Sequence, residues 1–505
     1  MALIEHRIVL DNPTFPLLSE FQGRTIMVRG SGELAYNQES SIPQVYYAHN
    51  VLPTPYGYQS IGFSEFIAPS TVGGFIGVVT LREASSESTA LLGITSTGRL
   101  LISTLAVPAW TELGLGGIGN IRNRPITVAY VQGVTYIYFY RLGCFVYDFT
   151  HKALVPVTLV GLDPTKINGI VGSQGYLVAF GVGNAVAWSN PILATDFVPS
   201  LVTGAGAGII EGAQGETVAA ITVQSGIIFL NASNATAAIY QANGRFPFFF
   251  EVIVGCGGLS DPNFASYTVL DSPAAYAYTT SGLQAINIKQ AEAILPQVTE
   301  FLSGRRLEDF NGETNKFTIT TPSNVIKKRL AWIADRYLVI SYGDELLTHA
   351  LVYDTFLGRL GKIRLDHVAI FEFTLFDQTI FETPKKSIGI LKADGSIVVV
   401  DTDIATTQQF GVMILGKYQY VRERRLMLQS VTLENIHARN NFTLQVLSSQ
   451  DGKTLDTAVT GYRTGNTGLS QDYLFSQEGK NHSILCKGRF NLVSGIIQFS
   501  PSGRL

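Results

Sequence analysis

The sequence predicts an all-β fold: a divergent β-propeller with a C-terminal β-sandwich-like domain and a short inserted helix. Short apolar runs of strand length recur along the chain between clusters of Gly, Asn and Ser. The 50 glycines follow no Gly-X-Y period, so they indicate many turns rather than collagen. One strand-and-turn motif occurs twice, as expected for a repeated blade. The Gly-His and Trp-Asp signature of the commonest propeller class is absent, so the propeller is expected to be a divergent one.

The composition limits the class of protein and its partners. The chain has 505 residues, of which 46% are apolar and only 15% are charged, against about 25% charged in average usage. Such a chain can bury a large core, and its low charge favours a place inside an assembly over a free monomer. A net charge of −3 argues against a dedicated nucleic-acid binder, whose affinity would depend on Lys and Arg.

The first residues differ from the rest of the chain. Residues 1–35 are expected to form an extended arm, because Pro13 and Pro16 interrupt any helix. Strand candidates then recur over residues 36–415, which predicts the propeller. The early candidates are residues 74–81, 90–94, 100–105, 126–131, 136–140 and 143–147.

The best-defined unit is a hairpin and loop at residues 176–199. An apolar run is followed by the turn Gly181-Val182-Gly183-Asn184 and a returning run that ends on Trp188. Asn190 and Asp196 then mark two turns, in which their side chains are expected to accept backbone hydrogen bonds. We expect Trp188 to be buried and to anchor the hairpin.

Two changes of pattern follow further along the chain. Residues 290–310 predict a short inserted helix, because Val298, Phe301 and Leu302 have the i, i+3, i+4 spacing of a helix face. Strand candidates resume at residue 317. Residues 416–505 contain longer strand candidates and predict the separate C-terminal β-sandwich-like domain.

The repeated motif is Val-Tyr-Asp followed six residues later by Leu. It occurs at residues 146–148 with Leu154 and again at residues 352–354 with Leu360. In both copies the Asp is expected to end a strand and to bond the next turn. The two copies are four to five blades apart if a blade has about 40–50 residues.

Several of these segments resemble the tail-nozzle proteins of short-tailed bacteriophages, the propeller-bearing "tail tubular protein B" class. Trp-Ser-Asn-Pro at residues 188–191, with Thr-Asp-Phe-Val-Pro at residues 195–199, is similar to a loop of that class. Residues 336–366 resemble a later blade, and parts of residues 451–483 are similar too. The resemblance spans roughly residues 130–500. The positions that carry it are Trp188, Asn190, Pro191, Asp196, Phe197, Tyr353, Asp354 and Gly358.

The resemblance implies a structural virion protein, assembled in the host cytoplasm and located in the phage tail. Copies of the chain would form a nozzle ring, a homohexamer by the resemblance, that extends the tail and conducts or retains DNA. Its partners would be other copies, other tail or adaptor proteins, and phage DNA passing without sequence-specific binding. Two alternatives stay open: a receptor- or carbohydrate-binding propeller on the virion surface, and a propeller glycosidase, whose two carboxylates meet in space and not in sequence.

No catalytic, cofactor-binding or metal-binding residue is predicted, and no enzyme is expected. The seven histidines are scattered, without a metal partner at i+4. Residues 114–119 match G-x-G-x-x-G in letters, but the run that follows, Asn120, Arg122, Asn123, Arg124 and Pro125, is not expected to offer a helix N-terminus for a pyrophosphate. The three cysteines are widely spaced and are expected to be core side chains. No window approaches about 18 apolar residues, so no membrane span is expected.

Four further patterns give weaker expectations. Residues 246–250, Phe-Pro-Phe-Phe-Phe, are either core or, if exposed, a docking patch. Gly-Ala-Gly-Ala-Gly at residues 204–208 is expected to be a flexible loop. The basic residues 327–329 are expected to face solvent or form salt bridges rather than contact DNA. His367 beside Asp366 is expected to form a surface turn pair.

Overall fold

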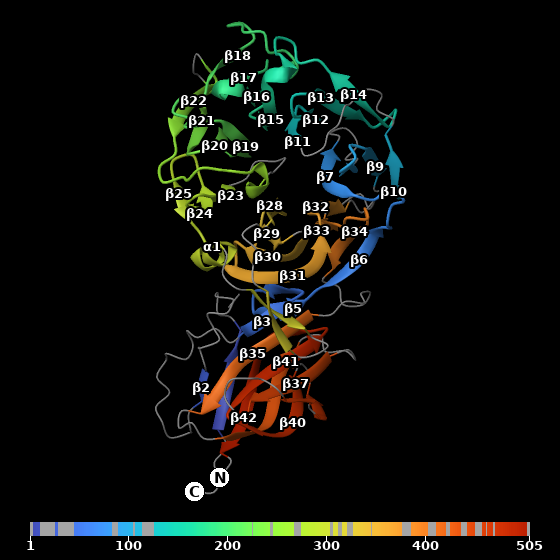
Figure 1. Cartoon of the computed structure of the whole chain (residues 1–505), viewed down its shortest axis with the longest axis vertical. Coiled ribbons are helices and arrows are strands. Elements are labelled where there is room, and N and C mark those ends of the chain that lie inside the picture. Colours follow the sequence, from blue (N-terminus) through green and yellow to red (C-terminus); the bar gives the residue numbers. More distant parts are fainter. Residues whose placement is uncertain are drawn as a thin grey trace.

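The computed structural model of the chain consists almost entirely of β-strands (Figure 1), which confirms the predicted fold class. It has two parts, a propeller and a sandwich that joins both ends of the chain. The structure describes residues 4–10, 26–28, 45–82, 89–104, 107–113, 126–224, 226–242, 246–266, 274–303, 307–311, 316–320, 327–344, 346–375, 385–401, 411–420, 425–435, 442–449, 457–460, 462–467 and 470–501.

Seven sheets in a ring form the propeller (Figure 1). Within blades 1 to 6 the strands pair antiparallel in chain order. Blades 1 to 4 contain β7 (Phe75–Arg82), β8 (Thr89–Thr95), β9 (Leu100–Thr104) and β10 (Val107–Glu112); β11 (Ile126–Val131), β12 (Val134–Phe139), β13 (Gly143–Asp148) and β14 (Ala153–Val157); β15 (Ile167–Ser173), β16 (Tyr176–Gly181), β17 (Ala185–Trp188) and β18 (Gly206–Ile209); and β19 (Thr217–Val223), β20 (Gly226–Asn231), β21 (Ala235–Tyr240) and β22 (Phe248–Val252).

The remaining three blades are less regular. Blade 5 has three strands, and the helix α1 follows it. A two-stranded hairpin then leads into blade 6. These elements are β23 (Ala275–Thr279), β24 (Gly282–Ile286), β25 (Ala291–Ala293) and α1 (Pro296–Leu302); the hairpin β26 (Leu307–Asn311) and β27 (Lys316–Thr320); blade 6 with β28 (Lys327–Ile333), β29 (Tyr337–Gly343), β30 (Leu347–Asp354) and β31 (Arg359–His367); and blade 7 with β32 (Ala369–Leu375), β33 (Lys385–Leu391), β34 (Ile397–Asp401) and β6 (Gly62–Ile67).

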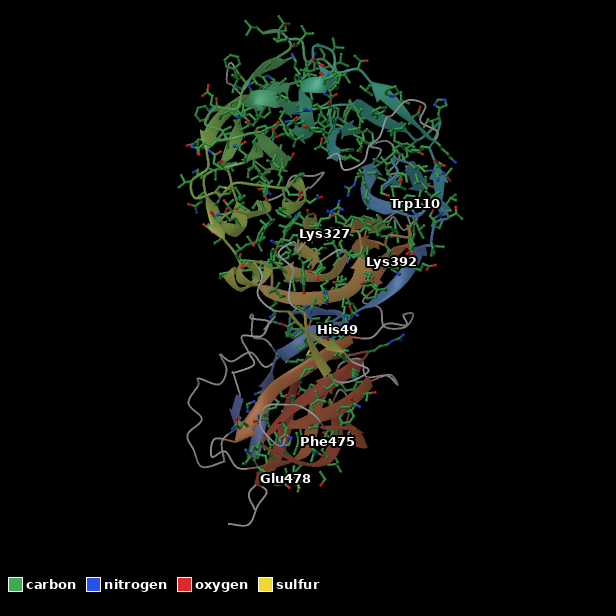
Figure 2. The ribbon with its side chains drawn as sticks, in the orientation of Figure 1. His49, Trp110, Lys327, Lys392, Phe475 and Glu478 are labelled. Atoms are coloured by element: carbon green, nitrogen blue, oxygen red, sulfur yellow. The ribbon has the colours of Figure 1, made fainter. Side chains whose placement is uncertain are left out.

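Apolar cores between neighbouring blades continue all the way round the ring. The ring closes between blades 7 and 1, where Phe373 packs with Phe75 and Leu91. Across the same junction Trp110, labelled in Figure 2, donates a hydrogen bond from Nε1 to the carbonyl oxygen of Gly395 at 2.6 Å. Blades 7 and 1 are therefore held together by apolar packing and by a hydrogen bond.

The outer strand of blade 7 comes from the other end of the propeller segment. β6 precedes blade 1 in the chain, yet it pairs with β34, with Gly62 opposite Asp401. The Oγ of Ser64 also donates to Oδ2 of Asp401 at 3.1 Å. One blade thus holds both ends of the propeller, which resists opening of the ring.

The repeated Val-Tyr-Asp motif occupies equivalent places, as the sequence predicts. β13 and β30 are each the third strand of their blade, and these are blades 2 and 6. Tyr147 pairs with Leu154, and Tyr353 pairs with Leu360 in the same register. The two copies are four blades apart, so the inference of a repeated blade is confirmed.

The predicted hairpin and helix are also found. β16 and β17 pair antiparallel around a tight turn in which Gly183 and Asn184 have positive φ angles of 70° and 59°. α1 lies inside residues 290–310 and buries Val298 and Leu302 against blade 5. Its Thr299 Oγ1 accepts a hydrogen bond from the backbone N–H of Leu283 at 3.0 Å.

The sandwich has two sheets, and each combines strands from both ends of the chain. Figure 1 shows it below the propeller, with blue and red strands side by side. The first sheet contains β1 (Ile4–Val9), β42 (Asn491–Pro501), β36 (Leu426–Asn435), β40 (Ser470–Gly479), β39 (Tyr462–Thr467), β5 (Gly57–Ser60) and β4 (Val51–Thr54); the second contains β2 (Ile26–Val28), β3 (Val45–His49), β35 (Gly411–Tyr420), β41 (Asn481–Gly488), β37 (Phe442–Ser449) and β38 (Thr457–Thr460).

The expected arm and domain boundaries therefore differ from the structure. β1 lies within residues 1–35, yet it pairs along its length with β42, and Ile4 and Ile8 are buried in the sandwich core. In Ile-Glu-His-Arg-Ile alternate residues face that core, a strand pattern that is too short to identify without its distant partner. β3, β4 and β5 lie within the expected propeller range, yet they belong to the sandwich sheets, and β35 runs through the expected boundary at residues 415/416.

One sheet passes from the propeller into the sandwich. β4 pairs with β31 of blade 6 at Val51 and Lys362, and β5 pairs with β42 at Leu492 and Tyr58. The buried core of the sandwich likewise continues into blades 5 and 6. The two parts are therefore joined by hydrogen-bonded strands and shared packing rather than by a linker.

The glycine-rich segment 204–208 is a strand in part, so the expectation of a flexible loop is wrong. Gly206 begins β18 and pairs with Trp188. A Cβ at Gly206 would lie 2.6 Å from the indole ring of Trp188. The strand needs glycine there because the tryptophan occupies the side-chain space.

Candidate functional site

Five of the eight positions that carry the resemblance form one structural unit in blade 3. Trp188 is 4% exposed, and its Nε1 donates a hydrogen bond to the carbonyl oxygen of Gly204 at 2.9 Å. The backbone N–H of Asn190 donates to the carbonyl oxygen of Asp196 at 2.7 Å, which closes the loop. Oδ1 of Asn190 accepts from the N–H of Ile192 at 2.9 Å. The predicted burial and the Asn190 turn are confirmed.

The other end of this loop contacts blade 2. Oδ1 of Asp196 accepts a hydrogen bond from the N–H of Val198 at 3.1 Å, again as predicted. Phe197 is fully buried in the core shared by blades 2 and 3. The carbonyl oxygen of Pro191 accepts a hydrogen bond from Gln132 in blade 2. The loop thus fixes one blade to the next.

The remaining three motif residues form a turn in blade 6. Asp354 is fully buried at the end of β30, and its Oδ2 accepts a hydrogen bond from Nε of Arg336 at 2.7 Å. Oδ1 accepts from the N–H of Phe356 at 3.0 Å. Gly358 has a φ of 65° and donates its N–H to the carbonyl oxygen of Asp354 at 2.9 Å. Tyr353 pairs across to β31.

The structure brings together the first five residues in one loop and the last three in one turn. These two units lie in blades 3 and 6 and do not meet. Their hydrogen bonds go to neighbouring backbone and to Arg336. They are accordingly positions that hold the fold, and the candidate functional site lies elsewhere.

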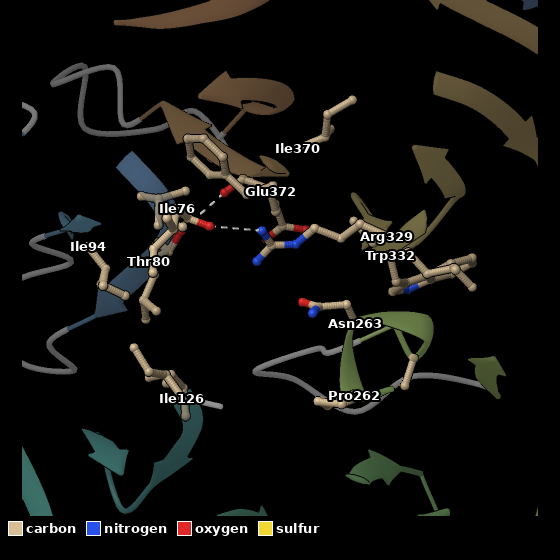
Figure 3. Close-up of a pocket in the computed structure, with 18 of the residues that line it drawn as sticks. Ile76, Thr80, Ile94, Ile126, Pro262, Asn263, Arg329, Trp332, Ile370 and Glu372 are labelled. Carbon is tan, nitrogen blue, oxygen red and sulfur yellow. Dashed lines mark hydrogen bonds between the residues drawn. The ribbon is translucent and has the colours of Figure 1, made fainter. Parts of the chain in front are cut away.

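A cavity of about 670 Å³ lies among the inner strands of the propeller. Its walls come from β7, β11, β28 and β32 and from residues 260–265 between blades 4 and 5. Figure 3 shows side chains from these elements converging on one space. Its size is within the roughly 300–1,000 Å³ usual for small-molecule sites.

Ion pairs bind the inner strands together at one part of the wall. Nη2 of Arg82 lies 2.8 Å from Oε1 of Glu372, so blades 1 and 7 are joined. Nζ of Lys386 lies 2.7 Å from Oδ2 of Asp335 and 3.6 Å from Oε2 of Glu372. Oε2 of Glu372 also accepts from the N–H of Ala334 at 2.9 Å. Two carboxylates of the cavity are therefore held by cations.

Arg329 crosses the cavity from blade 6. Its Nη1 donates to the carbonyl oxygens of Val368 at 3.2 Å and Ile76 at 3.4 Å. Figure 3 shows the guanidinium extending from β28 towards Ile76. The basic run at residues 327–329 does not form one solvated face, because Lys328 packs over the rings of Phe264 and Tyr278. Burial lowers the pKa of Lys328.

A short 3-10 turn, η5 (Pro262–Phe264), supplies the polar edge of the cavity. Asp261 caps it, because its Oδ1 accepts from the backbone N–H of Asn263 at 2.8 Å and from its Nδ2 at 3.0 Å. Asn263 is exposed, and in Figure 3 its amide faces the space beneath Arg329. The cavity thus meets solvent beside an amide and a carboxylate.

Apolar and aromatic side chains complete the lining. Ile94, Ile126 and Ile370 form part of the wall. Trp332 closes the side opposite Ile94 in Figure 3, and it stacks on Tyr276 at 4.8 Å between ring centroids. Its indole Nε1 is buried and has no hydrogen-bond partner in the structure as described. The arrangement can hold a small molecule with polar groups on one side and an apolar surface on another.

Other patterns from the sequence have different outcomes. His367 is buried, not part of a surface turn pair: its Nδ1 donates to the carbonyl oxygen of Leu365 and its Nε2 accepts from Ser341, while Asp366 is exposed. Cys144 and Cys486 are buried, as expected, and Cys256 is half-buried. Residues 114–119 lie outside the described residues.

The described residues contain neither a candidate metal-binding group nor a candidate membrane-spanning helix. Across these residues no group of three or more His, Cys, Asp or Glu side chains is arranged to hold a metal ion. No helix within the described ranges is long and apolar enough to cross a membrane.

Sequence reasoning missed the cavity residues. In the sequence Arg329 stands out only as part of a basic run, and Glu372 lies in an otherwise apolar strand. A usable signal was present for Asn263, because Asp163-Pro164-Thr165 and Asp261-Pro262-Asn263 are both Asp-Pro turns that begin with a side-chain cap. Only the second turn borders the cavity.

Comparison with known proteins identifies no family for the chain. No protein-family model matches it, and no curated protein is significantly similar in sequence. Two similar solved structures are β-propellers. The WD40 β-propeller domain of Doa1 has a TM-score of 0.40 and 9% identity, covering 68% of this chain and 97% of that one. The β-propeller domain of Cps50 (Swd1) from Myceliophteria thermophila has a TM-score of 0.36 and 11% identity, covering 67% and 99%.

Proposed function

We propose that the chain is a structural subunit of a phage tail nozzle, in which copies of the chain form a ring, a hexamer by the resemblance. The ring extends the tail, contacts other tail or adaptor proteins, and conducts or retains phage DNA. The observation that carries the proposal is a bare apolar patch on the outer rim of blades 3 and 4. This rim patch consists of Leu201, Val202, Ile209, Phe246 and Phe249, each at least half exposed.

The rim patch spans the junction between blades 3 and 4. Phe246 lies beside Trp188, with ring centroids 6.4 Å apart, so the start of β22 is next to the end of β17. β18 and β22 are the outermost strands of neighbouring blades, and Figure 1 shows them at the end of the propeller away from the sandwich. Of the two expectations for residues 246–250, Phe248 is core and Phe246 is exposed. Exposed apolar patches of this kind mark interaction sites.

The edge of β18 is also open to a neighbouring strand. Among the strands that the structure describes it is the last of its sheet, so one row of its backbone N–H and C=O groups faces outward. Its sequence, Gly-Ala-Gly-Ile, contains no charge and no proline. Every other outer strand that ends a blade sheet carries such a protecting residue: Pro108 and Glu112 on β10, Pro156 on β14, Glu251 on β22, Glu292 on β25 and Glu65 on β6.

In this proposal the lumen of the ring lies between copies and not inside one propeller. Arg329 and the Arg82–Glu372 pair lie among the inner strands of the propeller and line its cavity. A DNA duplex, whose major groove alone is about 12 Å wide, cannot pass through a cavity bridged by hydrogen bonds and ion pairs. A wall with a net charge of −3 supplies little of the salt-sensitive affinity that would slow DNA passage.

Sedimentation of the purified chain tests the proposal. Wild-type protein is expected to form closed oligomers, and Gly208→Lys is expected to weaken the association at least tenfold, because it places a charge on the open edge of β18. A Cβ at Gly208 meets no atom within 4 Å, so the variant should fold. The matched control is Val107→Lys, at an exposed position of β10 in blade 1.

Two results would contradict the proposal. Wild-type protein that stays monomeric at every concentration, alone and with tail components, would remove the ring. Oligomers that are indifferent to Gly208→Lys, or equally sensitive to Val107→Lys, would move the interface away from the rim patch.

A further inference from the structure

We propose that the central cavity of the propeller binds one neutral sugar unit. The unit is either a free monosaccharide or the terminal unit of a polysaccharide chain, since both present the same hydroxylated ring. This goes beyond the ring-forming role above and does not depend on it, because the rim patch lies on the outer strands of blades 3 and 4 and the cavity lies among inner strands.

Hydrogen-bond donors and acceptors from several elements line the same cavity. Arg329 supplies a guanidinium, and Asn263 supplies an amide with both a donor and an acceptor. Asp261 also lines the cavity, and its carboxylate keeps a second oxygen besides Oδ1, which accepts from Asn263. A hydroxyl group donates and accepts at once, so adjacent hydroxyls can match such a mixed set. A ligand with acceptors alone, such as a phosphate, would place its negative oxygens against the Asp261 carboxylate and the Asn263 amide oxygen, which are acceptors too.

Among the described residues that line the cavity or pair with its lining, the charges balance. Arg82 pairs with Glu372, and Lys386 pairs with Asp335. Arg329 and Asp261 then contribute one charge of each sign. A strongly charged ligand would enter a site without a matching excess charge, at a desolvation cost. A neutral polar ligand avoids that cost.

One side of the cavity wall is apolar. A sugar ring has a polar rim of hydroxyls and a face of C–H groups. The isoleucines at positions 94, 126 and 370 give the cavity an apolar side on which such a face can lie. Trp332, whose buried Nε1 has no partner in the structure as described, borders the same space. A ligand hydroxyl or its bound water would supply that partner.

Titration calorimetry with a defined panel tests the proposal. The neutral probes are glucose, galactose, mannose and N-acetylglucosamine. Maltotriose tests whether the end of a sugar chain binds. Glucuronic acid is the charged comparison, and glycerol is the blank. At least one neutral sugar is expected to bind with a dissociation constant of the order of millimolar, as its size allows. A maltotriose affinity above that of glucose would indicate a chain end.

Variants locate the binding in the cavity. Asn263→Leu is expected to weaken binding at least tenfold. Thr165→Leu is the matched control, because Thr165 occupies the equivalent Asp-Pro turn, bonds Asp163 in the same way and lies outside the cavity. Val128→Phe fills the cavity from blade 2 and should have the same effect as Asn263→Leu. Melting temperatures confirm that each variant is folded.

Several outcomes would overturn the proposal. If no neutral sugar of the panel binds, or if only glucuronic acid binds, the ligand class is wrong. If folded Asn263→Leu and Val128→Phe proteins both bind like wild type, the site is not this cavity.

Discussion

At the scale of single residues, Trp188 and Gly206 depend on each other. The indole fills the space that a side chain at residue 206 would occupy, and its Nε1 bonds the backbone of Gly204. The ring also packs edge-on against Phe248 at 6.1 Å. One aromatic residue therefore fixes both the third strand of blade 3 and the contact with blade 4.

We predict that Trp188→Ala lowers the free energy of unfolding by about 3–5 kcal/mol, the usual range for truncating a buried aromatic side chain. The measurement is denaturant unfolding followed by circular dichroism. Val107→Ala, at an exposed position of β10 in blade 1, is the control and should change stability by less than about 0.5 kcal/mol. Equal stability of the two variants would contradict the anchoring role.

Two buried histidines make the protein sensitive to acid. His482 donates from Nε2 to the carbonyl oxygen of Leu426 at 3.0 Å and accepts at Nδ1 from Ser448 at 2.8 Å. His367 is held in the corresponding way, between a carbonyl oxygen and a serine. Burial lowers the pKa of each ring to about 4.

The sign of the pH effect follows from these lowered pKa values. The folded state favours the neutral rings, so their contribution is complete above pH 6.5, the ordinary value, and is lost as the pH falls towards 4. We expect a loss of about 3 kcal/mol for each histidine over this range. The measurement is denaturant unfolding at several pH values. His482→Gln should flatten the decline, whereas His151→Gln should not, because Asp148 raises the pKa of that exposed ring.

At the scale of elements, the first strand decides how the ends of the chain are organised. We predict that Ile8→Ala lowers the free energy of unfolding by about 2–5 kcal/mol, because Ile8 is fully buried on β1. Arg7→Ala, the neighbouring exposed position, should change it by less than about 0.5 kcal/mol. Chemical denaturation of both variants checks this prediction. An unchanged free energy of unfolding in both variants would contradict it and would fit a free arm instead.

Local patterns were predictable because their causes are local. The turn at Gly183 and Asn184, the Asp148 and Asp354 strand ends and the α1 helix face all follow from neighbouring residues. β1 and β18 were not predictable, because β1 needs a partner from the other end of the chain and β18 is shaped by Trp188. The cavity likewise depends on strands far apart in sequence.

At the scale of the whole molecule, closure and rigidity have the same origin. Seven blades close into a ring because β6 returns to blade 7, and the sandwich closes because β1 returns to β42. The strands between them, β4 and β5, join the two parts through one sheet. A body of this kind can transmit the position of its sandwich to its distant rim, which suits a wall element of a larger ring.

Single-particle electron microscopy of the purified chain, and of the particle that carries it, tests the central claim most directly. We expect a closed ring with an axial lumen between copies, and neighbouring copies in contact at the rim of blades 3 and 4. We expect the ring to lie in the tail of the particle. Isolated monomers without a ring, or labelled protein found only at the tips of fibres, would contradict it.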